Sequence, residues 1–135
     1  MLPKEVAGRR AAEYIETGMV VGLGTGSTAE FAIRAIGERV AAGLEVKAIP
    51  TSEASAQLAG ELGITLTTLE DDPAVDLTID GADEVDPDLD LIKGLGGALL
   101  REKIVASATA QQVIIIDPSK LVKKLGTQAP LPIEV

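Results

Sequence analysis

Residues 19–28 read MVVGLGTGST, an apolar run followed at once by a turn rich in glycine and hydroxyl groups. The run Met19–Leu23 is bounded by glycines and has the length of a buried strand. Residues 29–42 then carry apolar side chains at three- and four-residue spacing, which predicts a helix that Gly43 ends. A buried strand that leads directly into a helix is the first half of a βαβ unit, which favours a parallel sheet.

The same alternation of strands and helices continues on both sides of this unit. Helices are expected over residues 4–16, 53–62 and 98–107, and strands over 45–49, 64–69, 75–80 and 113–117, the last of them fully buried. Thr51 and Ser52 are N-cap candidates for the helix over 53–62. Residues 85–92 alternate and predict a short edge hairpin, and a further strand would begin within the proline-rich residues 129–135. The pattern predicts one α/β domain over residues 1–135, with an open, mostly parallel, doubly wound (Rossmann-like) sheet and helices on both faces.

Composition narrows the chemistry that this chain can perform. It has 135 residues, 46% of them hydrophobic, with one tyrosine, one phenylalanine and a formal charge of −9. That charge and the scarcity of aromatic rings argue against nucleic acid or a lipid surface as a partner. With no histidine and no cysteine, catalysis would depend on carboxylates, lysines, hydroxyls and backbone amides. No run reaches membrane-spanning length and no signal-peptide core is evident, so we expect a cytoplasmic protein.

The loop Gly22–Thr28 predicts an anion site, because it joins a strand to a helix N-terminus and adds the hydroxyls of Thr25, Ser27 and Thr28. The alternative is a simple tight turn, which would not require three hydroxyls beside three glycines. A dinucleotide fingerprint would need a third glycine where Ser27 stands, and a P-loop would need a Gly-Lys-Ser/Thr ending. The loop therefore favours a single phosphate on a small molecule.

A second group of polar residues follows the apolar strand that ends at Asp80. Carboxylates at the carboxyl end of a parallel strand lie where open α/β sheets bind ligands, so Asp80 and Asp83 are candidates to hold sugar hydroxyls. Lys93 precedes a glycine-rich loop whose amides can approach an anion closely. Asp86, Asp88 and Asp90 resemble the start of a calcium loop, but a leucine stands where that loop needs glycine and a glycine where it needs glutamate. We interpret these three as a solvated hairpin face and expect no metal site.

Glu102 lies in the predicted helix after the glycine loop. Its neighbours on the helix surface are apolar or small, which would partly desolvate its carboxylate and raise its pKa. Arg101 has similar neighbours, so helix geometry leaves open whether Glu102 is a base or a surface residue. Lys120 ends the turn Asp117-Pro-Ser-Lys, and the predicted topology returns it to the edge of the sheet that carries the other loops, although a turn lysine usually faces solvent.

Five motifs, GLGTGST, DGADE, KGLGGALLREKI, DPSK and LGTQAPLPIEV, occur in this order and resemble type A ribose-5-phosphate isomerase over essentially the whole chain. The resemblance implies interconversion of ribose 5-phosphate and ribulose 5-phosphate in the pentose phosphate pathway, with no metal or other cofactor. It implies Glu102 as general base, and the chemistry of moving a carbonyl makes Lys93 a candidate donor to the enediolate oxygen and Asp80 and Asp83 candidates to hold the sugar hydroxyls. The substrate-binding positions that it implies are Lys4, Thr25, Gly26, Ser27, Thr28, Asp80, Gly81, Ala82, Asp83, Lys93, Gly94, Leu95, Gly96 and Lys120.

Two departures from the family qualify these expectations. Leu95 interrupts what is often an unbroken glycine run, which is harmless if its φ is ordinary and its side chain points away. Family members also continue past PLPIEV into a small second domain and often form homo-oligomers. The alternative hypothesis is therefore a catalytically weak or inactive sugar-phosphate-binding domain.

Overall fold

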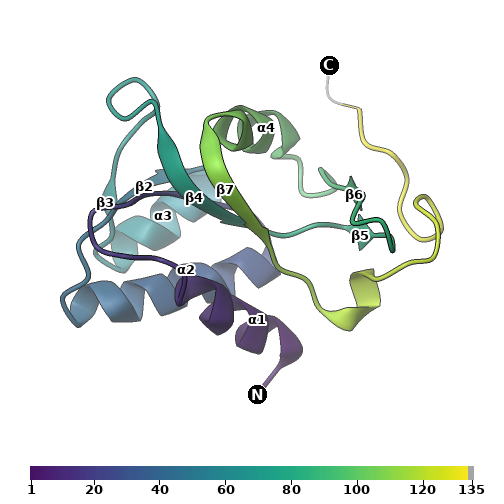
Figure 1. The fold of residues 1–135 in the computed structure, drawn as a ribbon, viewed down its shortest axis with the longest axis horizontal. Coiled ribbons are helices and arrows are strands. Elements are labelled where there is room, and N and C mark those ends of the chain that lie inside the picture. The colour runs from purple at the N-terminus through teal and green to yellow at the C-terminus, as the bar shows by residue number, and fades with distance from the viewer. Residues whose placement is uncertain (134–135) are drawn as a thin grey trace.

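The computed structural model describes residues 1–133, and a five-stranded sheet in the order β3-β2-β1-β4-β7 forms its centre (Figure 1). These strands are β1 (Val20–Leu23), β2 (Lys47–Pro50), β3 (Thr65–Leu66), β4 (Val75–Asp80) and β7 (Thr109–Ile114). Each neighbouring pair in this sheet is parallel. The predicted doubly wound α/β architecture is confirmed.

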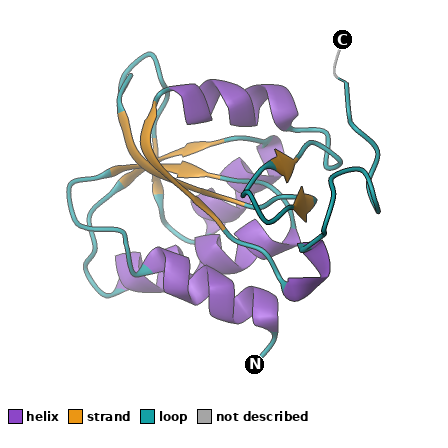
Figure 2. Cartoon of the chain, turned by 45° about the vertical axis from the view of Figure 1, so that its right-hand side comes forward, coloured by secondary structure: helices purple, strands orange, loops and turns teal. Residues whose placement is uncertain are grey.

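Helices cover both faces of this sheet (Figure 2). They are α1 (Pro3–Ala12), α2 (Ser27–Ala41), α3 (Glu53–Glu61) and α4 (Leu99–Ser107). The main core joins α1, α2 and α3 to one face through aliphatic side chains such as Val21, Ile36 and Leu77, each at most 1% exposed. A smaller core lies under α4, where Val105 packs with Ile49 and Val75. Aliphatic side chains thus fill both layers, as the near absence of aromatic residues predicts.

The order of the strands reverses between β1 and β4. From β1 the chain moves outward to β2 and β3, and residues 67–74 then return it to β4 on the other side of β1. The loops that leave β1 and β4 therefore turn away in opposite directions at the carboxyl edge of the sheet. Open α/β sheets bind their ligands in the crevice that forms at such a point.

Close contact between these two strands depends on Gly24. A Cβ at Gly24 would lie 2.2 Å from Oδ1 of Asp80 and 2.6 Å from its Cα, which is backbone that cannot move aside. We expect Gly24→Ala to lower the free energy of unfolding by about 1–3 kcal/mol, as overpacking does. Gly60 in α3 is the matched control, because a Cβ there meets nothing within 4 Å. Gly60→Ala should raise stability by about 0.5–1 kcal/mol, and urea unfolding of both variants measures the contrast.

The strand expected over residues 113–117 is only partly confirmed, because it is placed too late in the sequence and is not fully buried. The strand is β7, which starts four residues earlier, forms an edge of the sheet and exposes Ala110, Gln111 and Gln112. Its register is set by β4, since Val75 pairs with Thr109 and Asp80 with Ile114. The apolar residues that follow belong to the loop leading to Asp117.

Other boundaries also differ from expectation. Helix α1 ends at Ala12 rather than at residue 16, because the Arg39 guanidinium donates hydrogen bonds to the carbonyl oxygens of Ala12 and Ile15. The N-cap of α3 is Ser52, whose hydroxyl accepts a hydrogen bond from the Ser55 amide. Helix α2 begins at residue 27, two residues before the expected start, and β3 keeps only two of the six residues expected for it.

The hairpin expected over residues 85–92 exists, but it is a separate two-stranded sheet and not an edge of the main one. It pairs β5 (Glu84–Val85) with β6 (Leu91–Ile92) in antiparallel fashion. A 3-10 turn, η1 (Pro118–Lys120), follows β7, and the chain then passes along β5. Residues 129–133 form no strand, and the rest of the strand expected there lies outside the described residues.

Candidate active site

A cleft opens at the carboxyl edge of the sheet, between the loops that follow β1 and β4. Its cavity volume of about 150 Å³ is below the roughly 300–1,000 Å³ of sites for drug-sized ligands, which suits a small molecule. Every site residue expected from the sequence lines it except Leu95. The lining residues are Lys4, Thr25, Gly26, Ser27, Thr28, Asp80, Gly81, Ala82, Asp83, Lys93, Gly94, Gly96, Glu102 and Lys120.

Lys93 lies between two buried carboxylates. Its Nζ is 3.2 Å from Oδ2 of Asp80 and 3.1 Å from Oε1 of Glu102, and it also donates to the Gly81 carbonyl oxygen. The side chain of Lys93 is 16% exposed, that of Asp80 2% and that of Glu102 7%. One ammonium group therefore compensates two carboxylates that are largely withdrawn from water.

Glu102 occupies the first turn of α4, where its side chain leans back toward the glycine loop and Lys93. Burial raises the pKa of the Glu102 carboxyl above its usual range, and the negative charges of Asp80 and Asp83 add to the rise. The charge and hydrogen bond of Lys93 oppose it. A carboxylate with a raised pKa in a cleft has the properties of a general base.

Both carboxylate oxygens of Asp80 contact other groups of the protein. Oδ1 accepts hydrogen bonds from the amides of Gly81, at 2.7 Å, and Thr25, at 3.3 Å, while Oδ2 faces Lys93. The sequence indicates a carboxylate for sugar hydroxyls here. The observed contacts instead suit a residue that orients Lys93 and the loop after β1.

Asp83 is more accessible and is tied to the glycine loop. Its Oδ2 accepts a hydrogen bond of 3.0 Å from the Leu95 amide, and its own amide donates to the Ile92 carbonyl oxygen at 2.7 Å. The Leu95 side chain is 52% exposed and its φ is not positive, whereas Gly94 has a φ of 102°. The leucine therefore fits this loop without backbone strain. Its backbone amide contacts the cleft residue Asp83, while its side chain does not line the cleft.

A group of donors suited to an anion forms around the start of α2, and we call Lys4, Ser27, Thr28 and Lys120 the anion site. The helix begins at Ser27 without a side-chain cap, after Gly26 with a φ of 104°. Nζ of Lys4 donates to Oγ of Ser27 at 2.8 Å, and Thr28 and Lys120 line the same cleft. Uncapped amides at a helix N-terminus and two lysines match what a phosphate group needs.

Two residues near the anion site, Asp117 and Thr25, make contacts with other protein side chains. Asp117 lies 3.9 Å from Nζ of Lys4, and hydrogen bonds from Ser119, with the charges of Lys4 and Lys120, lower the pKa of its carboxyl. The Thr25 hydroxyl bonds with that of Thr51 at 2.8 Å, so it is already engaged within the protein. Ser27 and Thr28 are the hydroxyls of this loop that remain better placed for a ligand.

Glu84 is a buried acid that sequence reasoning missed. It is 0% exposed, and its carboxylate accepts three backbone hydrogen bonds, from Gly126 at 2.7 Å, Gln128 at 2.6 Å and Ala129 at 2.9 Å. Burial raises the pKa of the Glu84 carboxyl, but these three bonds outweigh it and the pKa is lowered. The donors are more than 40 residues away in sequence, and no local pattern marks them.

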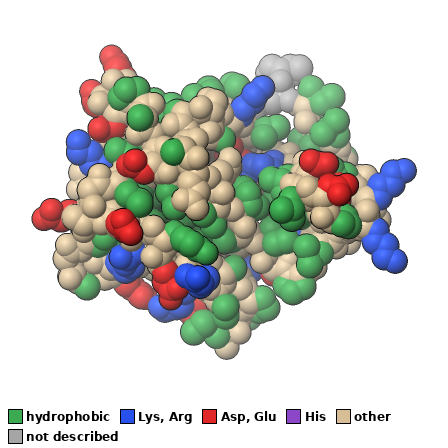
Figure 3. Space-filling model, in the orientation of Figure 1, with side chains coloured by type: hydrophobic (Ala, Val, Ile, Leu, Met, Phe, Trp, Pro, Cys, Tyr) green, Lys and Arg blue, Asp and Glu red, His purple; other side chains and the backbone are tan. Residues whose placement is uncertain are grey.

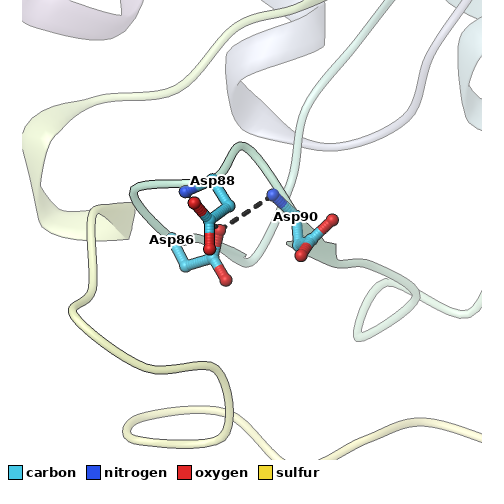
Figure 4. Close-up of side chains that lie close together, drawn as sticks. All are labelled: Asp86, Asp88 and Asp90. Atoms are coloured by element: carbon cyan, nitrogen blue, oxygen red, sulfur yellow. Dashed lines mark hydrogen bonds between the residues drawn. The ribbon is translucent and has the colours of Figure 1, made fainter.

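Asp86, Asp88 and Asp90 cluster in the hairpin turn, with ligand atoms within 4.8 Å of one another (Figure 4). Oδ1 of Asp86 accepts hydrogen bonds of 2.9 Å from the amides of Asp88 and Asp90. The Asp86 carboxylate therefore closes the turn, and the other two are exposed. This agrees with a solvated hairpin face.

Charged side chains of both signs are scattered over the face seen in Figure 3. Among residues 1–133, no helix combines the length and the apolar character that crossing a membrane requires.

A family model and several curated relatives match this chain. The family model for ribose 5-phosphate isomerase A (phosphoriboisomerase A) matches residues 47–135. Ribose-5-phosphate isomerase A of Gloeobacter violaceus is 61% identical over 133 residues, which make up 98% of this chain and 58% of that protein. The chain thus spans a little more than half the length of the curated relatives it matches.

Solved structures agree with the sequence relatives. Ribose 5-phosphate isomerase A of Methanocaldococcus jannaschii matches with a TM-score of 0.90 at 45% identity, covering 95% of this chain and 57% of that one. A D-ribose-5-phosphate isomerase solved in complex with phospho-erythronic acid matches with a TM-score of 0.92 at 41% identity and the same coverage. By its sequence and by its fold, this chain belongs to the ribose 5-phosphate isomerase A family.

Proposed function

We propose that this chain carries the active site of an aldose–ketose isomerase that interconverts ribose 5-phosphate and ribulose 5-phosphate. The observation that carries the proposal is the buried Glu102 carboxylate, which contacts Lys93 in a cleft that also contains the anion site. A sugar phosphate needs both parts, because its carbon atoms react while its phosphate anchors it. Family membership supports the same reaction, and one solved relative binds phospho-erythronic acid.

Glu102 is the proposed general base. It removes the proton from the carbon next to the carbonyl and returns it to the neighbouring carbon, so the carbonyl moves between C1 and C2. The intermediate is an enediolate, whose negative oxygen needs hydrogen-bond donors. Lys93 and the amides of Gly94 and Gly96 are the proposed donors, since they lie in the same loop that faces Glu102.

The other cleft residues position the substrate. The anion site holds the phosphate, and Asp83 accepts a hydrogen bond from a sugar hydroxyl and can move a proton between the two oxygens. Asp80 keeps Lys93 in place through its 3.2 Å contact. These roles are part of the proposal, and they divide the cleft into groups that react and groups that bind.

The pH dependence of the reaction provides a test of the base. Because burial and neighbouring carboxylates raise the pKa of Glu102, its active, ionised form should be lost on acidification at a higher pH than for an ordinary glutamate. We therefore expect kcat to fall on the acid side at a higher pH than an ordinary glutamate would give. A profile of kcat from about pH 4 to 9 at saturating substrate measures it, and an acid limb no higher than that of an ordinary glutamate would contradict the assignment.

The second candidate function is phosphosugar binding without efficient turnover. It requires only the anion site, whose donors can bind a phosphate whether or not Glu102 acts as a base. An isomerase assay on the 135-residue chain, beside calorimetric titration with ribose 5-phosphate, separates the two. Turnover supports the isomerase, whereas binding with no turnover supports the binding domain.

The proposal extends to the setting of the enzyme. A cytoplasmic location is expected for an enzyme of this pathway, and a homo-oligomer is the expected assembly. Sedimentation equilibrium of the purified chain measures the second expectation directly.

A further inference from the structure

The segment after η1, residues 121–129, lies beside the hairpin and is held by the two residues of β5. Val85 forms a parallel bridge with Leu121 and accepts a hydrogen bond of 2.9 Å from the Val122 amide. Glu84 receives the amides of Gly126, Gln128 and Ala129. Both ends of the segment are therefore fastened to the same short strand.

We call the three hydrogen bonds to Glu84 the tether. Residues 121–129 make few other contacts that would hold them in place. Lys123 and Lys124 are exposed, as are Gly126 and Gln128, and the hydrogen bond from Thr127 to Lys124 is local. The three bonds to Glu84 reach across 42 to 45 residues, and they are made to a carboxylate with no exposure to solvent. Charge-assisted bonds to backbone amides are among the stronger hydrogen bonds in proteins.

Both β5 and the tethered segment follow a residue that lines the cleft. Lys120 of the anion site immediately precedes the tethered segment, and Asp83 immediately precedes Glu84. The place of Asp83 is fixed by its own bonds to Ile92 and Leu95, which do not involve the Glu84 side chain. Lys120 has a local contact of its own, since its amide donates to the Asp117 carbonyl oxygen at 3.1 Å, and it is also the cleft residue to which the tethered segment is joined.

We propose that Glu84 is a positioning residue for substrate binding, which holds residues 126–129 beside β5 and, together with the contacts of Val85 to residues 121 and 122, keeps Lys120 in the anion site. This inference rests on the proposed function, because it assigns Lys120 to the phosphate of the substrate. It predicts that the Glu84 side chain affects binding of the phosphate more than the chemical step.

The main test is a double-mutant cycle of Glu84→Gln and Lys120→Met, with ribose 5-phosphate and inorganic phosphate as probes. Glutamine has the shape of glutamate, but its single amide oxygen cannot accept all three amides. We expect Glu84→Gln to weaken binding of each probe about three- to tenfold, with KM changed more than kcat. In the Lys120→Met background the same change should weaken binding less than about twofold, because interacting residues are not additive. Equal losses in both backgrounds, or no loss in either, would overturn the proposal.

Limited trypsin digestion reports the tether without any activity. Cleavage after Lys123 and Lys124 should be faster in Glu84→Gln than in wild type and unchanged in Glu70→Gln, which alters an exposed loop glutamate. If Glu84→Gln does not fold, amide exchange of the wild-type chain decides instead. The amides of Gly126, Gln128 and Ala129 should be protected, and rapid exchange of all three would refute the tether.

The outcomes also separate this inference from the proposed function. A wild-type chain that binds phosphate but has no turnover contradicts the isomerase and leaves the cycle measurable by titration. A wild-type chain that binds neither probe contradicts the anion site, and this inference with it.

Discussion

Glu102→Gln is expected to lower kcat by about 10²- to 10⁴-fold, the usual contribution of a positioned general base. The amide keeps the size of the carboxylate and can still accept a hydrogen bond from Lys93, but it cannot take a proton from carbon. Binding of ribose 5-phosphate should change by less than about threefold, because the anion site is intact. Steady-state kinetics and calorimetric titration measure the two quantities separately.

The control for this change is Glu70→Gln, which alters an exposed glutamate in the loop between β3 and β4. It should leave kcat and KM at the wild-type values. Turnover by Glu102→Gln at the wild-type rate would remove Glu102 as the base. A loss of binding equal to the loss of turnover would make it a binding residue instead.

Lys93→Met should reduce both catalysis and stability. Loss of a donor to the enediolate oxygen costs on the order of 10²- to 10³-fold in kcat. Removal of the cation also leaves Asp80 and Glu102 as buried carboxylates without their partner. Breaking a buried ion pair costs about 3–5 kcal/mol, and the partial exposure of Lys93, 16%, points to the lower end, about 3 kcal/mol.

The stability loss of Lys93→Met should depend on pH in a defined direction. Without Lys93, the influence that lowers the pKa of Glu102 is gone, so the pKa rises further and the folded chain binds a proton more readily than the unfolded chain. The destabilisation should therefore shrink as the pH falls toward 5 and grow as it rises toward 8. Urea unfolding at both pH values measures it, with Lys103→Met, an exposed lysine of α4, as control. A loss that is equal at both pH values would show that the carboxylates do not carry the effect.

Local signals in the sequence were sufficient for the centre of the fold and for most of the cleft. The apolar run of β4 is bounded as expected, at Val75 and Asp80. Parallel strands bring their carboxyl ends together, so loops that are 50 residues apart could be assigned to one crevice. The structure also resolves the choice between Arg101 and Glu102, since Arg101 is exposed and pairs with Glu53 at 3.4 Å while Glu102 is buried.

The errors arise where a distant partner decides the structure. The apolar run after Val113 resembles a buried strand, but the hydrogen-bonding groups of β4 select the more polar residues from Thr109 onward. The early end of α1 depends on hydrogen bonds from Arg39. The role of the Glu84 carboxylate depends on three backbone amides that lie far from it in sequence. None of these contacts has a local signature. The sequence likewise has no local signal for the hydrogen bonds that Asp80 and Thr25 make within the protein.

The outer side of the edge strand β7 is suited to pairing with a further strand. Its residues TAQQVI contain no charge and no proline, whereas natural sheet edges are usually protected by such residues or kept very short. The opposite edge, β3, has only two residues and offers little template. Among residues 1–133 no strand pairs with the outer side of β7, so its backbone groups there can accept a further strand.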